Sequence, residues 1–171
     1  MEEKIRLFLK RKFGDAVLGE DNFRGDQSFF ISAESLFPIC EALQDSGELD
    51  IKFLADITAV DWQGHESAKD GRFEVVYNLY SLSHCYRFFL RVRLPESNPS
   101  VSSLTDLWAG ANWMEREVYD MFGITFEGHP DLTRILTPDG FEGHPLRKDF
   151  SITYEQPMFN WNKDNPPEVI K

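Results

Sequence analysis

The sequence is poor in the residues and spacings that hold redox cofactors. Only two of its 171 residues are cysteines, Cys40 and Cys85, and they form no C-x-x-C pair. An iron–sulfur cluster needs about four thiolates, so we expect no cluster in this chain. The sequence also contains no G-x-G dinucleotide fingerprint and no G-K-[ST] phosphate loop. We therefore expect that the chain binds no cofactor of its own.

Basic residues and long hydrophobic runs are also scarce. There are 18 basic against 29 acidic residues, which gives a net charge of −11. Phosphate attraction needs clustered lysine and arginine, so nucleic acid and the anionic surface of a bilayer are poor candidate partners. No apolar run approaches the ~18 residues that predict a transmembrane helix, and the chain begins with two acidic residues, Glu2 and Glu3, where a signal peptide is basic. We expect a protein of the reducing cytosol with free thiols.

Histidine is present at four positions, without an H-x-x-x-H pair. Two of them, His129 and His144, belong to copies of the same five residues, Phe-Glu-Gly-His-Pro, at 126–130 and 141–145. Two His and two Glu suit zinc or iron, so a metal-binding module is one hypothesis. A proline after each histidine restrains the backbone to an extended form, and nothing in the sequence fixes the copies face to face. We expect no metal here.

Hydrophobic periodicity predicts a set of helices and strands in the first 122 residues. Helices are expected over 1–13, from Ser35 as N-cap to about Asp45, and over 112–122; strands are expected over 28–31, 51–62, 72–81 and 86–94. The 51–62 strand is rich in apolar residues and is expected to be mostly buried, and the last two strands form a hairpin. The pattern predicts an α+β domain, a small mixed sheet with helices packed on it.

Three arginines, Arg87, Arg91 and Arg93, alternate with apolar residues in the second strand of the hairpin. Alternation puts them on one face of the sheet. A solvated face is the simple interpretation, and a surface for an anionic partner is the alternative.

The helix over 112–122 is dense in charge. Asn112 is expected to cap it, with Glu115 three residues on completing a capping box. Arg116 and Asp120 have the i, i+4 spacing of an ion pair, and Gly123 is expected to end the helix. Glu117 and Asp120 are i, i+3 and could share acid–base work, so a freestanding hydrolase is a further hypothesis.

From residue 123 to residue 171 the character of the chain changes. These 49 residues hold six of the nine prolines and four of the eleven glycines, together with apolar residues at irregular spacing. A structureless loop of this length is unusual in a compact domain. We predict a core domain at 1–122 and a long extended C-terminal arm at 123–171 that wraps over a partner surface.

Several motifs in one order resemble a known family. They are Phe-Leu-Ala-Asp-Ile-Thr-Ala-Val-Asp at 53–61, Arg-Phe-Glu-Val-Val-Tyr at 72–77, Leu-Thr-Asp-Leu-Trp at 104–108, Glu-Arg-Glu-x-x-Asp-Met-Phe at 115–122, and Gly-His-Pro-Leu-Arg-Lys-Asp-Phe at 143–150. Together they resemble the 30 kDa-type subunit of proton-translocating NADH:quinone oxidoreductase, the one designated C in the bacterial form of respiratory complex I. The resemblance spans nearly all of residues 1–150, while residues 152–171 match nothing.

The resemblance implies a non-redox subunit of the peripheral arm. It would pack beside the quinone-site (49 kDa-type) subunit and the terminal Fe-S cluster subunit, while partner subunits bind FMN, the Fe-S clusters and quinone. The complex would pass electrons from NADH to quinone coupled to proton translocation, on the cytoplasmic side of the bacterial inner membrane. The equivalent subunit of a membrane-bound hydrogenase or of an F420H2- or ferredoxin-linked dehydrogenase is the alternative.

The same resemblance suggests roles for ten residues, none of them catalytic. Arg134, Arg147 and Lys148 would donate charge-assisted hydrogen bonds to partner groups. The helix residues would set the angle at which the arm leaves the domain, and the two histidines would fix turns. The expected partner interface comprises Glu115, Arg116, Glu117, Asp120, His129, Arg134, His144, Arg147, Lys148 and Asp149. Thr133 departs from the basic residue or proline usual in the family.

Overall fold

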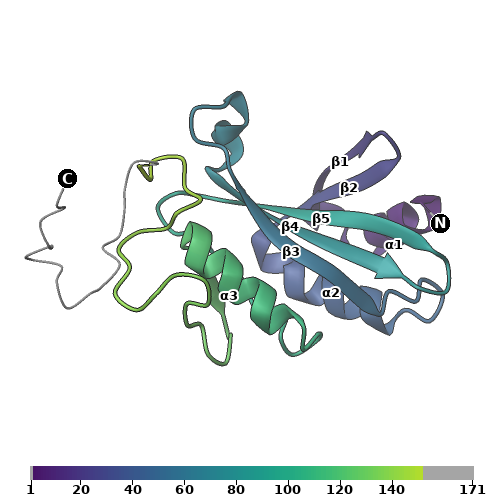
Figure 1. Cartoon of the computed structure of the whole chain (residues 1–171). Coiled ribbons are helices and arrows are strands. Elements are labelled where there is room, and N and C mark those ends of the chain that lie inside the picture. The colour runs from purple at the N-terminus through teal and green to yellow at the C-terminus, as the bar shows by residue number, and fades with distance from the viewer. Residues whose placement is uncertain (1, 152–171) are drawn as a thin grey trace, which may run out of the picture.

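The computed structural model describes residues 2–151 and has an α+β fold, a five-stranded mixed sheet with three helices (Figure 1). The helices are α1 (Glu2–Phe13), α2 (Leu36–Asp45) and α3 (Ala111–Phe122), and short 3-10 turns are η1 (Gly14–Ala16), η2 (Ala33–Ser35) and η3 (Glu66–Asp70). The strands of the sheet are β1 (Val17–Phe23), β2 (Asp26–Ile31), β3 (Phe53–Asp61), β4 (Phe73–Ser81) and β5 (Tyr86–Leu94). No helix within 2–151 is long and apolar enough to cross a membrane.

The sheet has the order β1-β2-β5-β4-β3. Strands β2 and β5 are parallel and the other neighbours are antiparallel. The predicted hairpin is confirmed, with Phe73 opposite Leu94 and Ser81 opposite Tyr86. Strand β1 was not predicted, because its acidic and glycine residues suit a solvated edge strand rather than a typical one.

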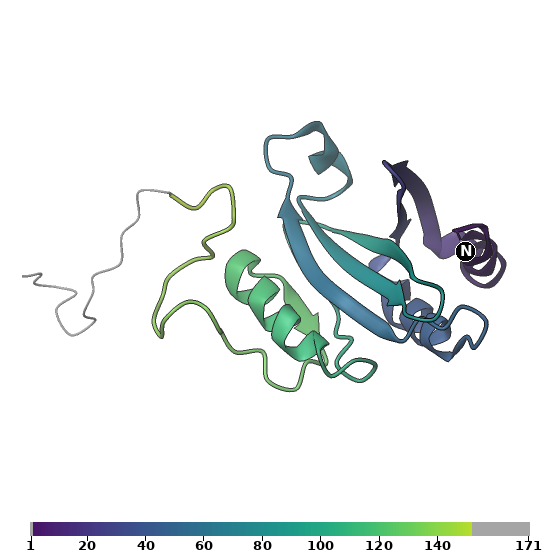
Figure 2. The ribbon, with the colours of Figure 1, turned by 45° about the vertical axis from the view of Figure 1, so that its right-hand side comes forward.

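All three helices lie on the same side of the sheet (Figures 1 and 2). Alternate residues of β4 and β5 point into this side and are fully buried, among them Tyr77 and Phe88. Strand β3 lies at an edge of the sheet and its burial alternates. The expectation of a mostly buried strand was therefore wrong: Phe53 is 49% exposed because helices cover only one face.

Helix α3 begins at Ala111, and Gly110 rather than the expected Asn112 occupies the N-cap position. The predicted capping box is also wrong. The Glu115 side chain has no exposed surface and accepts hydrogen bonds from the Leu104 N–H and the Ser103 hydroxyl, both at 2.7 Å. Its carboxylate therefore binds the residues that precede the helix, because Glu115 lies on the buried side of α3. Ser35 does precede α2, but its side chain makes no capping hydrogen bond.

The end of α3 is as predicted. Gly123 adopts the left-handed conformation (φ 71°) and its N–H donates to the Tyr119 carbonyl. The chain then forms β7 (Thr125–Glu127), which pairs in parallel with β6 (Ser100–Ser102) in a second, two-stranded sheet that was not predicted. From residue 128 to residue 151 the described chain is irregular. The rest of the predicted arm, residues 152–171, lies outside the described residues.

Candidate functional site

One carboxylate on the outer face of α3, that of Asp120, binds the chain segment that follows the helix. Asp120 has no exposed surface and accepts hydrogen bonds from three consecutive backbone N–H groups at 2.8–3.0 Å. These belong to Ile135, Leu136 and Thr137, and the Thr137 hydroxyl donates as well, at 2.5 Å. Burial alone would raise the pKa of Asp120, but these hydrogen bonds outweigh it and lower the pKa to about 2.

Two arginines add to the contacts of Asp120, and together these contacts form the first anchor of the segment that follows α3. Arg134 pairs with Asp120 at 3.0 Å and also donates to the Gly143 carbonyl at 3.0 Å. Arg116 donates to the carbonyls of Thr133 and Arg134. The expected ion pair between Arg116 and Asp120 is wrong, because both side chains bind the irregular segment, whose backbone groups have no strand or helix to satisfy them.

The two repeated histidines lie against opposite ends of α3. His129 accepts from the Asp131 N–H through Nδ1, so its Nε2 donates to the Asn112 carbonyl, at 3.2 Å. His144 bonds the Asp120 carbonyl through Nδ1 at 2.9 Å. Burial, with the nearby charges of Arg147 and Arg134, lowers the pKa of His144. No group of three or more His, Cys, Asp or Glu side chains within the described range 2–151 could hold a metal ion.

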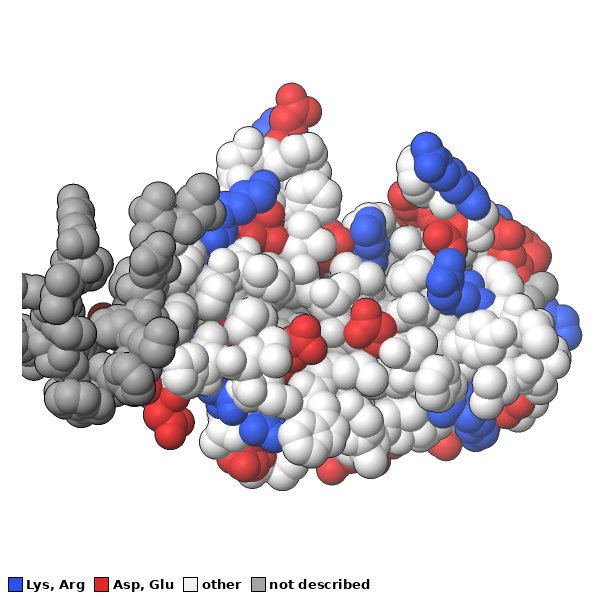
Figure 3. Space-filling view, viewed as in Figure 1, with Lys and Arg blue, Asp and Glu red and all other residues white. Residues whose placement is uncertain are grey.

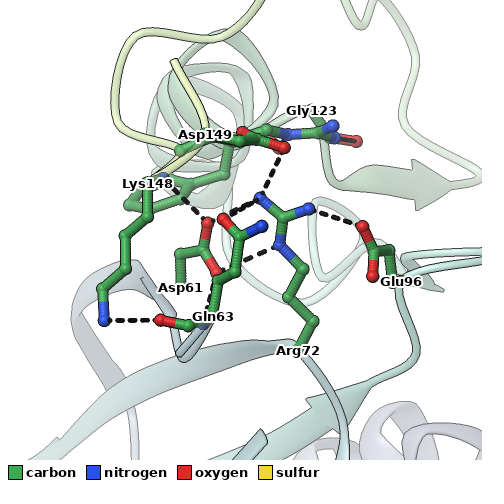
Figure 4. A network of polar contacts seen from close by, with 9 residues as sticks. Asp61, Gln63, Arg72, Glu96, Gly123, Lys148 and Asp149 are labelled. Carbon is green, nitrogen blue, oxygen red and sulfur yellow. Dashed lines mark hydrogen bonds and ion pairs between the residues drawn. The ribbon is translucent and has the colours of Figure 1, made fainter. Parts of the chain in front are cut away.

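A second anchor ties residues 148 and 149 to the end of the sheet (Figure 4). Arg72, only 6% exposed, pairs with Asp61 and Asp149, both at 2.9 Å, and with Glu96 at 2.6 Å. Asp61 also accepts from the backbone N–H of Lys148 at 2.9 Å. Burial would raise the pKa of Asp61, but the hydrogen bonds from Arg72 and the backbone lower it to about 2.

Between these anchors the chain crosses the end of α3. The Arg147 guanidinium donates to the carbonyls of Phe122 and Gly123 and lies over the Phe73 ring, 5.0 Å from its centre. A side chain at Gly123 would collide with His144 and Arg147. The glycine is therefore needed for both its conformation and the close approach of the returning chain.

The structure brings nine of the ten expected interface residues to one region. Asp120, His129, Arg134, His144, Arg147, Lys148 and Asp149 hold residues 128–151 in place, Arg116 assists them, and Glu117 is exposed beside them. Glu115 lies apart, in the core, where burial raises its pKa to about 7 against the opposing effect of its hydrogen bonds. Glu117 and Asp120 form no acid–base pair, because Asp120 is fully engaged.

Sequence reasoning missed three residues of this region. The sequence marks Asp61 and Arg72 only as strand ends, and their partners lie far along the chain. Trp113 is 61% exposed and stacks with Arg116, whose guanidinium is 5.0 Å from the ring centre. A signal for Trp113 was available: with Arg116 and Asp120 it has the i, i+3, i+7 spacing of one helix stripe, outside the apolar one.

Known proteins are similar to this sequence over most of its length. Residues 29–156 match the family described as "Respiratory-chain NADH dehydrogenase, 30 Kd subunit". An NADH-quinone oxidoreductase subunit of Roseiflexus castenholzii, designated C, is 47% identical over 91% of this chain and 87% of that protein. The protein of the same description from Geobacter sulfurreducens is 42% identical over 84% of this chain and 86% of its own length.

Solved structures share the fold. One, "Nqo5 of the trypsin-resistant fragment (1-134) in P63 form", is 36% identical and covers 77% of this chain and 100% of its own, with a TM-score of 0.65. Another comes from "the membrane-bound sulfane sulfur reductase (MBS), an archaeal respiratory membrane complex". It is 25% identical, with a TM-score of 0.72, and covers 89% of this chain and 86% of its own.

Proposed function

The chain belongs to the family of the 30 kDa subunit of NADH-quinone oxidoreductase, and from this premise we propose how it serves respiratory complex I, of which it is a peripheral subunit. Its role is non-redox and structural: it joins neighbouring subunits of the quinone-reduction module. Partner subunits bind FMN, the Fe-S clusters and quinone. The neighbours are chiefly the quinone-site (49 kDa-type) subunit and the terminal Fe-S cluster subunit, on the cytoplasmic side of the membrane.

The observation that carries this proposal is the surface formed by α3 and residues 131–146, which we call the α3 surface. Trp113 and Leu136 are each 61% exposed and Leu146 is 54% exposed. Backbone held by Asp120 runs between them, so these apolar side chains are presented from a fixed framework. Tryptophan and arginine are the residue types enriched at the energetic centres of interfaces, and Arg116 already stacks on Trp113.

Many polar contacts hold residues 128–151, a segment without secondary structure. We attribute them to preorganisation, because they hold the segment in its binding conformation before a partner arrives. Ordering a loop on binding weakens an interface by its conformational entropy, and a segment already held in place avoids that loss. Asp120, Arg134 and Arg147 make their hydrogen bonds within the chain, and we propose that they fix the α3 surface rather than contact the partner directly. Glu117 is exposed beside it and makes no ion pair with residues 2–151, so it is free to meet a partner cation.

The electron donor is chosen elsewhere in the assembly. The fold also occurs in an archaeal sulfane sulfur reductase complex, so the scaffold is compatible with different electron-transfer partners. Sequence identity of 47% to an NADH-quinone oxidoreductase protein favours the NADH-linked complex over the hydrogenase-like alternative.

The test is assembly of the whole complex with the double variant Trp113→Ala, Leu136→Ala. Loss of two interface anchors is expected to lower recovery of assembled complex roughly tenfold or more, while thermal unfolding of the isolated subunit stays unchanged because both side chains are exposed. The matched control is Leu82→Ala, an apolar side chain 64% exposed in the β4–β5 turn. Normal recovery in the double variant, or an equal loss in the control, would contradict the proposal.

A further inference from the structure

Strand β3 is the outermost strand at one end of the sheet, and α3 packs against it (Figures 1 and 2). Its neighbour β4 can bind backbone groups on one side of β3 only. The hydrogen bond from the Trp62 N–H to the Arg72 carbonyl, at 2.8 Å, shows which residues these are. In an antiparallel pair such bonds recur at every second residue. Thr58 and Val60 therefore direct their backbone groups towards β4, and the residues between them direct theirs outwards.

The outward-facing backbone groups belong to Ile57 and Ala59. Within residues 2–151 neither their N–H groups nor their carbonyls hydrogen-bond another residue. The two side chains are 4% and 8% exposed and lie on the helix side of the sheet. The backbone at these positions is thus held in strand geometry by β4 and by the core. Two donors and two acceptors are presented in a row with the spacing of a β-ladder, which is a template for another strand.

Edge strands of natural proteins are usually guarded against pairing by lysine, proline or a bulge. In β3 the register shifts between Leu54 and Asp56, which interrupts the first part of the edge. Residues 57–60, Ile-Thr-Ala-Val, contain no charged residue and no proline. The surface over β3 and the neighbouring part of α3 is mainly uncharged, with isolated acidic groups (Figure 3). This stretch is therefore open to a further strand.

We propose that an extended segment of a neighbouring subunit pairs with residues 57–60 of β3 and adds a strand to the sheet. This strand addition rests on the proposed function, because it requires a neighbouring subunit, and it continues the α3 surface onto the sheet. Backbone hydrogen bonds supply the affinity in this mode of binding, and alternate side chains supply the fit. The segment should place apolar residues on the helix side, beside Ile57 and Ala59, and polar residues on the other side, beside the exposed Thr58.

Two other occupants of the edge fit less well. A second copy of the chain carries the same net charge of −11, which opposes association. In residues 152–171, Pro157 leaves five residues after Ser151, too few both to turn the chain back and to pair along residues 57–60. Residues 158–165, before the next proline, include three asparagines, an aspartate and a lysine, which are residue types depleted in strands.

The first test is assembly of the whole complex with Ala59→Pro. Proline removes the outward N–H and places its ring at the edge, so recovery of assembled complex should fall roughly tenfold. The N–H is not used within the sheet, and proline is tolerated at such edge positions, so thermal unfolding of the isolated subunit should be retained. The matched control, Ala59→Ser, keeps the N–H and should assemble normally. Normal recovery of Ala59→Pro, beside reduced recovery of Trp113→Ala, Leu136→Ala, would overturn the strand addition and leave the α3 surface proposal standing.

The second test needs no variant and decides the question even if Ala59→Pro folds poorly. Amide hydrogen exchange is measured in the free subunit and in the purified complex. In the free subunit the amides of Thr58 and Val60 should exchange slowly and those of Ile57 and Ala59 fast. On assembly, exchange at Ile57 and Ala59 should slow roughly a hundredfold or more. Unchanged exchange at these two amides would overturn the proposal.

The third test identifies the occupant. A photo-crosslinking amino acid replaces Thr58 in the assembled complex, and mass spectrometry identifies the attached peptide. The expected product is a segment of another subunit in which apolar and polar residues alternate. A crosslink to residues 152–171 or to a second copy of the chain would overturn the proposal, and so would the absence of any product.

Discussion

The two parts of this subunit are held by different forces. The sheet and its helices enclose a continuous apolar core that includes Tyr77, Phe88 and Leu90. Residues 128–151, by contrast, are held largely by two buried carboxylates, Asp61 and Asp120, that accept hydrogen bonds from backbone groups. Apolar burial is nondirectional and tolerates small shifts, whereas a carboxylate bound by several N–H groups fixes one conformation. The irregular segment is therefore positioned as closely as an element of secondary structure.

The largest effect is expected in the apolar core. Phe88→Ala removes a fully buried ring of β5 that packs against the Phe29 ring, and should lower the free energy of unfolding by about 3–5 kcal/mol. Urea unfolding of the isolated subunit measures it, and Leu82→Ala, at an exposed position, should change it by less than about 0.5 kcal/mol. Equal losses in the two variants would mean that the core is not where the stability lies.

The next effect should be local to the irregular segment. Asp120→Asn removes the Arg134 ion pair and leaves an amide that cannot accept all five hydrogen bonds, so residues 134–137 should open more easily by about 2–4 kcal/mol. Hydrogen exchange at the amides of Ile135, Leu136 and Thr137 measures this directly. Glu117→Gln on the same helix is the control and should leave their exchange unchanged. Unaltered protection in Asp120→Asn would show that other contacts hold the segment.

The contributions of the two parts to folding stability should change with pH in opposite directions. Asp61 and Asp120, with pKa values lowered to about 2, stabilise the fold above their unfolded pKa near 4, and this stability is lost as pH falls towards 2. Glu115 has its pKa raised to about 7, so stability falls as pH rises from about 4.5 to 7. Unfolding measured from pH 4 to pH 8 should show that decline, and Glu115→Gln should flatten it. A decline of the same size in Glu115→Gln would assign it to another group.

The smallest effects distinguish Arg147 from Lys148. Arg147→Ala removes donors to two carbonyls and should weaken the segment by about 1–2 kcal/mol. Lys148→Ala should cost less than about 0.5 kcal/mol, because the backbone N–H that binds Asp61 is kept and only the exposed hydrogen bond from the ammonium group to the Gln63 carbonyl is lost. Proteolysis rates within residues 128–151 measure both. A reversed order would place the contact of residue 148 in its side chain.

The sequence predicts the central hairpin well and the polar anchors poorly. Alternation in β4 and β5 is a local signal, as is the glycine that ends α3. The prediction for Glu115 fails because a glutamate three residues after an asparagine looks like a capping box, whereas its burial depends on how α3 packs. The donors to Asp120 include backbone groups 15 to 17 residues away, and no side-chain pattern encodes them.

Hydrogen exchange of the protein, free and within the purified complex, tests the central claim most directly. If the α3 surface docks the neighbouring subunits, peptides covering Trp113 and residues 131–146 should gain strong protection on assembly, while exposed peptides around Leu82 should not. Unchanged exchange across the α3 surface in the assembled complex would contradict the account.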